Sequence, residues 1–401
     1  GFTGSAGIAI ITEKIASIFV DGRYTVQVKQ QVDSNIYDIL HLIKTPYLQW
    51  INDNLPSGSL IGYDSRLHRS SWVIATKKII GEHLQLTEII GNPIDLLWHN
   101  RPETNKDVAM LLDDRYTGKS SKLKREELGK IIANNKCDAA FLTQLDSIAW
   151  LLNIRGNDVP CNPVLLCHGL FYSDGSFDLF ICENKIPAGF HEHVGPNVTI
   201  IPPEEIMSRL KELSGQTIQL DVNSSNAWSY DILLDSGVVI MEKKDPCTLP
   251  KACKNDVEIQ GMKNCHIRDA VAVCNFLSWL DSEIDIGNLW NEGILSDKID
   301  AYRGKLTLFK GISFATISAA GGNAAMCHYN HTNHEVPSTL TLNSVYLVDS
   351  GGQYLDGTTD ITRTVAVGKP NDFITKTFTL VLKGHIALGS AQFPEGIAGQ
   401  H

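Results

Sequence analysis

The sequence lacks the features of a membrane-spanning or nucleic-acid-binding protein. It contains no run of about eighteen apolar residues, the length that a membrane-spanning helix needs. Its 35 lysine and arginine residues face 45 acidic residues, which gives a formal net charge of -10, and they form no basic stripe that could follow a phosphate backbone. We therefore predict neither a membrane span nor a nucleic-acid partner.

Cysteine pairs and terminal signals are also missing. The nine cysteines are odd in number and scattered, without a CxxC pair, which is typical of a protein in the reducing cytoplasm. No initiator methionine or signal peptide precedes Gly1, and the sequence runs into His401 without a polar tail. We expect residues to be missing at both ends.

An internal duplication is visible in the first two thirds of the chain. The segments GSLIGYDSRLHRSSW (58–72) and GQTIQLDVNSSNAW (215–228) both read as a strand, an aspartate, a polar turn and a tryptophan on a helix. A hairpin-like pair precedes each, at 7–24 and 162–186. The alternative is that any two α/β modules share such patterns. If the duplication is real, the first copy lacks the opening helix and strand of the second.

The length of 401 residues and two polar linkers predict three domains. We place them at 1–117, 118–248 and 249–401, the first with its start missing and the third with its carboxy-terminal part missing. The first two are predicted to be α/β and the third α+β, opened by a long core-facing helix over about 255–282 and closed by a helix around 373–390.

Two aspartates in LVDSGGQYLDGTTDITRT (347–364) are candidate metal-binding residues. Asp349 ends one strand-like run and Asp360 begins another, so a strand-turn-strand would bring them onto neighbouring strands. Two carboxylates that close repel unless cations neutralise them. One interpretation is a pair that bridges two metal ions and activates water. The other is that both aspartates serve only the turn, whereas a calcium loop is excluded because the alternating oxygen ligands and late glutamate are absent.

His328 lies about twenty residues upstream, in ISAAGGNAAMCHYNH (317–331). The small residues before it would let the backbone run close to a substrate, and its imidazole could donate to or shuttle a proton for a scissile bond. The alternative is an ordinary surface or core histidine, one of 13 in the chain.

These motifs together resemble a known family. DSGGQYLDGTTDITRT and the His-Tyr of CHYN are similar to the Xaa-Pro aminopeptidases (aminopeptidase P) of the pita-bread metallopeptidase superfamily. The resemblance extends over nearly the whole chain, and its long three-domain subtype fits best. The further motifs that carry it are GFTGSAG near the start, DGRY at 21–24, RPE at 101–103, LDSIAWLLNIRGNDVPCNPV at 145–164 and HIRDAVAVCNFLSWL at 266–280.

The resemblance implies a fold and a metal site. It implies two creatinase-like α/β amino-terminal domains followed by an incomplete pita-bread catalytic domain. It further implies two divalent ions, usually Mn²⁺ with Zn²⁺ or Co²⁺ as alternatives, held by two Asp, one His and two Glu. Asp349 would bind one ion, Asp360 would bridge both, and His328 would contact the peptide beside the scissile bond without binding metal.

The other three ligands of the family lie beyond the given sequence. His401 matches none of them, so we expect this fragment to be inactive. For the complete protein the resemblance implies removal of the first residue from peptides with proline at position two, and a homodimer. The cysteine pattern adds the expectation of a cytoplasmic location. A prolidase-like Xaa-Pro dipeptidase and a catalytically dead pita-bread binding module are the alternatives.

Arg23 in DGRY is a weaker candidate for substrate binding. The resemblance implies that the amino-terminal domains help to shape the substrate pocket or the dimer contact. The alternative is a structural ion pair at the end of a strand.

Overall fold

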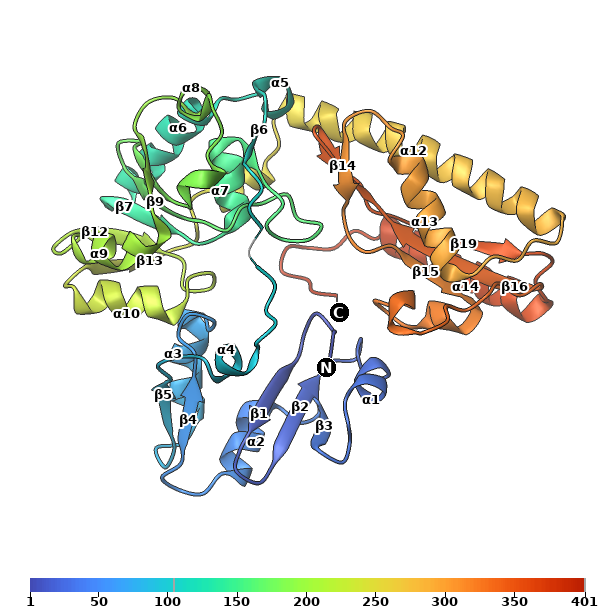
Figure 1. Cartoon of the computed structure of the whole chain (residues 1–401), viewed down its shortest axis with the longest axis horizontal. Coiled ribbons are helices and arrows are strands. Elements are labelled where there is room, and N and C mark those ends of the chain that lie inside the picture. The colour runs from blue at the N-terminus through green and yellow to red at the C-terminus, as the bar shows by residue number, and fades with distance from the viewer. Residues whose placement is uncertain (104, 400–401) are drawn as a thin grey trace. The chain divides into compact units, whose positions relative to one another are not determined.

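The computed structural model describes residues 1–103 and 105–399 (Figure 1). The chain divides into two compact units. Unit 1 comprises Gly1–Cys265 with Gln353–Gly357, and unit 2 comprises His266–Gly352 with Thr358–His401. Among the helices of the described residues, none is long and apolar enough to cross a membrane.

The second copy of the predicted duplication, here called the second repeat, contains the strands between residues 139 and 242 of unit 1. It is built on a six-stranded sheet with the order β11-β10-β9-β7-β12-β13. Its β9 and β10 form an antiparallel hairpin, whereas β12 pairs in parallel with both β7 and β13. The strands are β7 Ala139–Leu142, β9 His168–Tyr172, β10 Phe177–Phe180, β11 Val198–Ile201, β12 Thr217–Leu220 and β13 Val239–Glu242.

Helices cover both faces of this sheet. Because successive side chains of a strand point to opposite faces, Ala140 and Leu142 of β7 join one core while Ala139 and Phe141 join another. The first core packs against α6 Ser121–Asn134, α7 Leu145–Leu152 and α8 Phe190–Val194, and the second against α9 Ile206–Lys211 and α10 Ala227–Asp235. This double burial explains why β7 is a continuous apolar run rather than an alternating one.

The first repeat has the same pairings but two separate sheets. β1 and β2 form an antiparallel hairpin, β2 pairs in parallel with β3, and β4 pairs in parallel with β5. The elements are β1 Ile8–Ile11, β2 Ala16–Val20, β3 Tyr37–His41, β4 Leu60–Tyr63, β5 Gln85–Glu88, α1 Gln27–Gln31, α2 Tyr47–Asn54 and α3 Ser70–Ile79. These pairings confirm the predicted duplication. Within the described residues, no strand equivalent to β7 joins β1 to β4.

The two repeats contact each other through the turns that the sequence comparison singled out. The Ser70 amide donates to the Ser225 carbonyl at 2.9 Å, and the Ala227 amide donates to the His68 carbonyl at 2.8 Å. These reciprocal bonds join the amino-terminal ends of α3 and α10. Equivalent segments of the repeats therefore pack together as partners.

Short elements complete unit 1. They are α4 Pro93–Leu97, β6 Met110–Leu111, α5 Asp114–Thr117, β8 Ile154–Arg155, η1 Glu183–Lys185, η2 Pro203–Glu205 and α11 Thr248–Ala252. The small β6–β8 pair is antiparallel. The long helix α12 Asp256–Asp285 then carries the chain from unit 1 into unit 2, which confirms the predicted long helix in this region.

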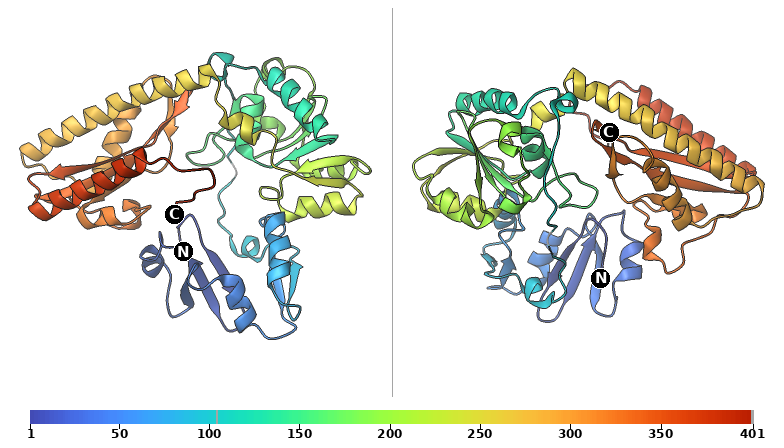
Figure 2. Two further views of the ribbon diagram at one scale, coloured as in Figure 1. Left: turned by 180° about the vertical axis from the view of Figure 1, so that it is seen from behind. Right: turned by 45° about the horizontal axis from the view of Figure 1, so that its top comes forward.

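Unit 2 is organised around the antiparallel sheet β15-β16-β19, seen from two further directions in Figure 2. One core joins apolar residues of α12 and α13 to Tyr346 and Val348 of the central strand. The further elements of unit 2 are α13 Glu292–Arg303, β14 Phe309–Ile312, β15 Ile317–Ala320, η3 Gly321–Ala325, η4 His331–Asn333, β16 Ser344–Ser350, β19 Ile361–Val367 and α14 Asp372–Ser390. The short strands β17 Gly352–Tyr354 and β18 Gly357–Thr358 cross the boundary between the units, because Gln353–Gly357 belongs to unit 1.

The closing helix differs from the others in unit 2. α14 spans nearly the range predicted for it, yet none of its residues is buried, and Phe373, Val381 and Leu388 are each more than two thirds exposed. By contrast, α12 and α13 are joined in the core by the fully buried ion pair between Asp269 and Arg303, in which Nε lies 2.7 Å from Oδ1.

Candidate active site

The two predicted metal-binding aspartates lie at the paired ends of β16 and β19. Asp349 is directly opposite Thr362 in the antiparallel register, and Asp360 immediately precedes β19. Because Asp360 is two residues from Thr362, both point to the face on which Asp349 lies. The sequence analysis did not single out Thr362. The sequence feature that could have indicated it is the spacing Asp-Ile-Thr at 360–362, which in an extended strand places the threonine hydroxyl on the same face as the carboxylates.

The turn between the aspartates explains the glycines. A Cβ atom on Gly351 would overlap the backbone carbonyl oxygen of Thr359. Thr359 in turn closes the turn, because its amide donates to the Gly352 carbonyl at 2.9 Å and its Oγ1 accepts from the Gly352 amide at 2.9 Å. The close approach of these backbones holds the ends of β16 and β19 together.

The electrostatics of the pair favour a cation. Burial raises the pKa of the Asp349 carboxyl, and the charge of Asp360 raises that pKa further, against a hydrogen bond from Thr362 and the charge of His328. The buried Oδ1 atom of Asp349 has no hydrogen-bond partner. A buried acceptor without a donor is costly, and a divalent cation would satisfy it while cancelling the repulsion. The carboxylate donor set therefore fits a hard or borderline metal ion.

His328 lies on the segment that leaves β15. This strand pairs with β16, with Ile317 opposite Asp349, and the chain then continues through η3 to an exposed His328. The backbone of His328 has φ +56°, in the left-handed region that non-glycine residues rarely occupy. Since His328 contributes to the electrostatic environment of Asp349, the structure brings all three predicted residues of unit 2 into one neighbourhood.

Arg23 has a structural partner in unit 1. Its Nη2 lies 2.6 Å from Oδ2 of Asp21 and its Nε donates to Oδ1 at 3.0 Å. Its guanidinium also stacks on the Tyr24 ring, 5.1 Å from the centroid. These contacts are those of the ion-pair interpretation, and a substrate role for Arg23 stays a prediction.

No further metal ligand accompanies the aspartates within the described residues. These residues contain no group of three or more His, Cys, Asp or Glu side chains that could hold a metal ion. His401, which we did not expect to be a ligand, lies outside them. Of the metal ligands expected from the sequence, the described residues therefore contain Asp349 and Asp360.

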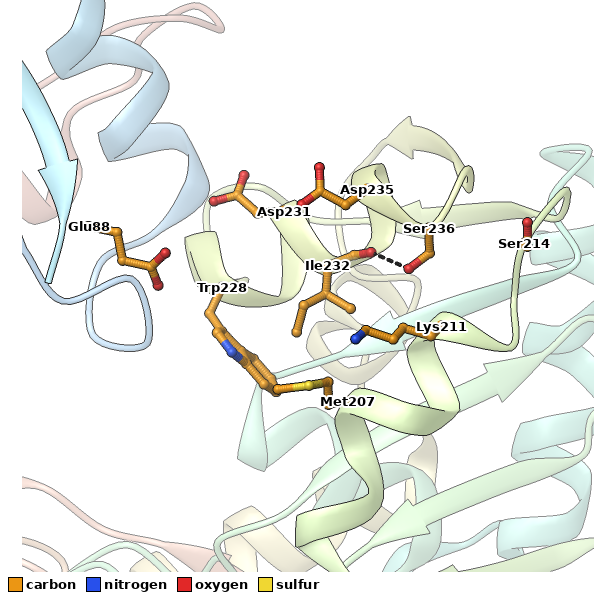
Figure 3. A pocket seen from close by; sticks show the side chains of 9 residues that line it. All are labelled: Glu88, Met207, Lys211, Ser214, Trp228, Asp231, Ile232, Asp235 and Ser236. Carbon is orange, nitrogen blue, oxygen red and sulfur yellow. Dashed lines mark hydrogen bonds between the residues drawn. The ribbon is translucent and has the colours of Figure 1, made fainter. Parts of the chain in front are cut away.

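A separate pocket of about 670 Å³ opens in unit 1 (Figure 3). It contains none of the predicted site residues. Three carboxylates and one ammonium group line it among apolar and hydroxyl side chains. The Ser236 hydroxyl donates a hydrogen bond to the Ile232 carbonyl at 2.7 Å. The lining residues are Glu88, Met207, Lys211, Ser214, Trp228, Asp231, Ile232, Asp235 and Ser236.

Comparison with known families matches the chain along its length. The creatinase/prolidase N-terminal domain matches at residues 1–91 and, in a second family model of that description, at 100–258. Metallopeptidase family M24 matches at 260–401. A probable Xaa-Pro aminopeptidase P of Paracoccidioides lutzii is 36% identical over the whole chain, which covers 67% of that relative. This chain belongs to the Xaa-Pro aminopeptidase family.

Other members of the family agree. The Xaa-Pro aminopeptidase ApepP of Drosophila melanogaster is 35% identical over the whole chain, which covers 66% of that protein. The crystal structure of the X-prolyl aminopeptidase from Caenorhabditis elegans, described as a cytosolic enzyme with a di-nuclear active site, superimposes with a TM-score of 0.92 at 35% identity. The match covers 99% of this chain and 66% of the worm enzyme.

These comparisons confirm the resemblance, the fold class and the enzyme class predicted from the sequence. The chain has creatinase-type amino-terminal domains and an M24 metallopeptidase domain, and its relatives are Xaa-Pro aminopeptidases. It spans about two thirds of the length of the curated relatives it matches. The Xaa-Pro dipeptidase of Bacillus anthracis shares the fold at a TM-score of 0.53 and 20% identity, over 67% of this chain.

Proposed function

We propose that the complete protein hydrolyses the first peptide bond of peptides that carry proline at position two. The observation that carries this proposal is the Asp349–Asp360 pair, held at the ends of β16 and β19 with a buried, unpartnered oxygen, in a chain of the Xaa-Pro aminopeptidase family. Proline needs a dedicated peptidase, because its nitrogen lacks the N–H that other peptidases bind and its ring fixes φ.

In this proposal the chain's own residues have distinct roles. Asp349 would hold one divalent ion and Asp360 would help to hold both, and such ions would polarise the scissile carbonyl and lower the pKa of a bound water. His328 contacts the peptide beside the scissile bond, where its imidazole donates a hydrogen bond that strengthens as charge develops. Thr362 supports Asp349 by its hydrogen bond. Arg23 is a weaker proposal for a substrate contact, because Asp21 already engages its guanidinium.

Several finer features belong to the same proposal. We propose Mn²⁺ as the metal, with Zn²⁺ or Co²⁺ as alternatives, because carboxylate and imidazole ligands accept all three. We also propose a homodimer and a cytoplasmic location, the latter supported by the cytosolic enzyme of Caenorhabditis elegans. The proposed domains are 1–117, 118–248 and 249–401, with the catalytic residues in the third.

The test compares the full-length protein with the fragment 1–401, each supplied with Mn²⁺. Release of the first residue from Xaa-Pro-Xaa peptides is measured for the wild type, for Asp360→Asn and for Asp281→Asn, a control at an exposed position of α12. We expect activity in full-length wild type and in the control, and none in Asp360→Asn or in the fragment.

Other outcomes would point to the alternatives. Cleavage of Xaa-Pro dipeptides alone would make the protein a prolidase. A full-length protein that neither cleaves peptides nor binds Mn²⁺ would contradict the enzyme proposal and favour a binding module.

A further inference from the structure

The segment that carries His328 is attached to one buried carboxylate. Glu292 is the first residue of α13 and its side chain is completely buried. It accepts four hydrogen bonds: from the Ala320 amide at 2.7 Å, the Asn323 Nδ2 at 2.9 Å, the Tyr329 hydroxyl at 2.8 Å and the Ser338 amide at 3.1 Å.

All four partners are neutral donors. An ionised carboxylate offers only acceptors, so Glu292 matches this set, whereas a glutamine would turn an N–H₂ group toward two of the donors. A buried charge is costly unless it is hydrogen-bonded, and here four bonds offset that cost. Glu292 therefore fixes the groups that it binds with charge-assisted bonds, which are stronger than neutral ones.

The four donors are distributed along the chain around His328. Ala320 and Ser338 stand at the two ends of the segment, while Asn323 and Tyr329 stand inside it. Asn323 also donates to the Tyr329 hydroxyl at 2.9 Å, so the interior anchors are themselves joined. A single side chain thus holds both ends and the middle of the segment 320–338.

Tyr329 connects this anchor to His328. Its side chain is 5% exposed and points to Glu292, whereas its neighbour His328 is exposed with a left-handed backbone. Such a conformation is strained and persists only where the surroundings fix it. The inward bond of Tyr329 holds the residue after His328, which restricts the direction in which the imidazole can point.

We infer that Glu292 is a positioning residue for His328, acting through Tyr329 and Asn323. The inference rests on the proposed function, in which His328 contacts the peptide beside the scissile bond. Loss of the Glu292–Tyr329 bond would leave the fold in place but release the imidazole from its productive orientation. Small errors in the orientation of a catalytic group lower turnover more than they lower substrate binding.

The experiment uses the full-length protein with Mn²⁺ and an Xaa-Pro-Xaa peptide. Tyr329→Phe removes only the hydroxyl, and we expect kcat to fall about 10-fold with KM changed less than about 3-fold and Mn²⁺ content unchanged. Tyr346→Phe is the matched control, because it also removes a buried hydroxyl of unit 2, one that lies 2.8 Å from the Ser318 hydroxyl. It should change thermal stability to a similar extent and leave kcat unchanged.

A double-mutant cycle separates positioning from general destabilisation. In a His328→Ala background, Tyr329→Phe should have no further effect on kcat, because the group that it positions is gone. Glu292→Gln should behave in the same way as Tyr329→Phe where it folds. Equal kcat for wild type and Tyr329→Phe, or an undiminished effect of Tyr329→Phe without His328, would overturn the inference. Absence of cleavage by the wild type would instead contradict the proposed function.

Discussion

The carboxylates of unit 2 fall into two groups that differ in whether their buried oxygens have hydrogen-bond partners. In the helical layer, Asp269 of α12 has a bidentate arginine partner and Glu292 of α13 has four donors, and both side chains are completely buried. At the ends of β16 and β19, Asp349 and Asp360 face each other, and one buried oxygen of Asp349 has no partner. The satisfied carboxylates lie in the core, whereas the carboxylate with an unpartnered oxygen, Asp349, lies where a catalytic metal is proposed.

This difference in hydrogen bonding distinguishes carboxylates that stabilise the fold from carboxylates that are available to bind a ligand. A buried carboxylate that is fully hydrogen-bonded stabilises one packing arrangement. Its removal lowers the free energy of unfolding, because its former donors stay buried without a hydrogen-bond partner. A pair that repels in the folded state lowers stability until a ligand binds, and such local conflicts are concentrated at functional sites. Glu292 connects the two regions, since it is a core group that holds the segment of His328.

The largest effect is expected in the helical layer. Asp269→Asn should lower the free energy of unfolding by about 3–5 kcal/mol, because it removes the bidentate counter-charge of the buried Arg303 guanidinium and leaves it only the longer ion pair with Asp300 at 4.0 Å. Urea unfolding at pH 7 measures this, with the exposed Asp281→Asn on the same helix as the control. A loss no larger than that of the control would show that the α12–α13 ion pair contributes little.

The strand pair should respond to metal instead. In the full-length protein, Mn²⁺ at about 100 times its dissociation constant should raise the free energy of unfolding by about 2.7 kcal/mol, because it binds only the folded state. Thermal denaturation of wild type, Asp349→Asn and Asp269→Asn with and without Mn²⁺ measures this. Asp269→Asn should keep the metal-dependent gain and Asp349→Asn should lose it; an equal gain in both would break the distinction between the two regions.

The smallest effect is expected from the strand pair without metal. Since the folded pKa of Asp349 is raised, the folded state binds more protons than the unfolded state between the ordinary aspartate pKa of about 3.9 and the raised value. The contribution of Asp349 to stability is therefore most favourable below this window and falls as pH rises through it.

A comparison of wild type with Asp349→Asn isolates this contribution, because other carboxylates are common to both proteins. Above the window, Asp349→Asn should be the more stable by about 0.5–1 kcal/mol, and the difference should shrink at lower pH. Urea unfolding in chelator across pH 4 to about 7 measures it. A difference that grows as pH falls would contradict the repulsion between Asp349 and Asp360.

Local pattern predicted much of the molecule. The similarity of 58–72 to 215–228 predicted equivalent modules, and both segments do form a strand followed by a helix, β4 with α3 and β12 with α10. The spacing of Asp349 and Asp360 around a glycine turn predicted that they would meet on adjacent strands. In the structure Asp349 lies in β16 opposite Thr362, and Asp360 lies two residues before Thr362, directly at the start of β19. Such features follow from side-chain periodicity and turn chemistry, which short segments contain.

Other features depended on residues far apart in the sequence. Glu292 follows Asn291 at a helix start, and nothing near it indicates that Tyr329 and Ser338 will donate to its side chain. The left-handed backbone at position 328 could not be predicted from the residue type, because it is occupied by a histidine and not by glycine or asparagine, which adopt this conformation most readily. The ion pair between Asp269 and Arg303 likewise joins positions 34 residues apart.

The sequence by itself therefore determined the repeats, the strand-turn-strand that carries the aspartate pair, and the family. The tertiary structure alone decided which carboxylates are satisfied and which are not. The physical reason is that hydrogen bonding and desolvation of a buried charge depend on the groups that packing brings within about 3 Å, whatever their separation along the chain.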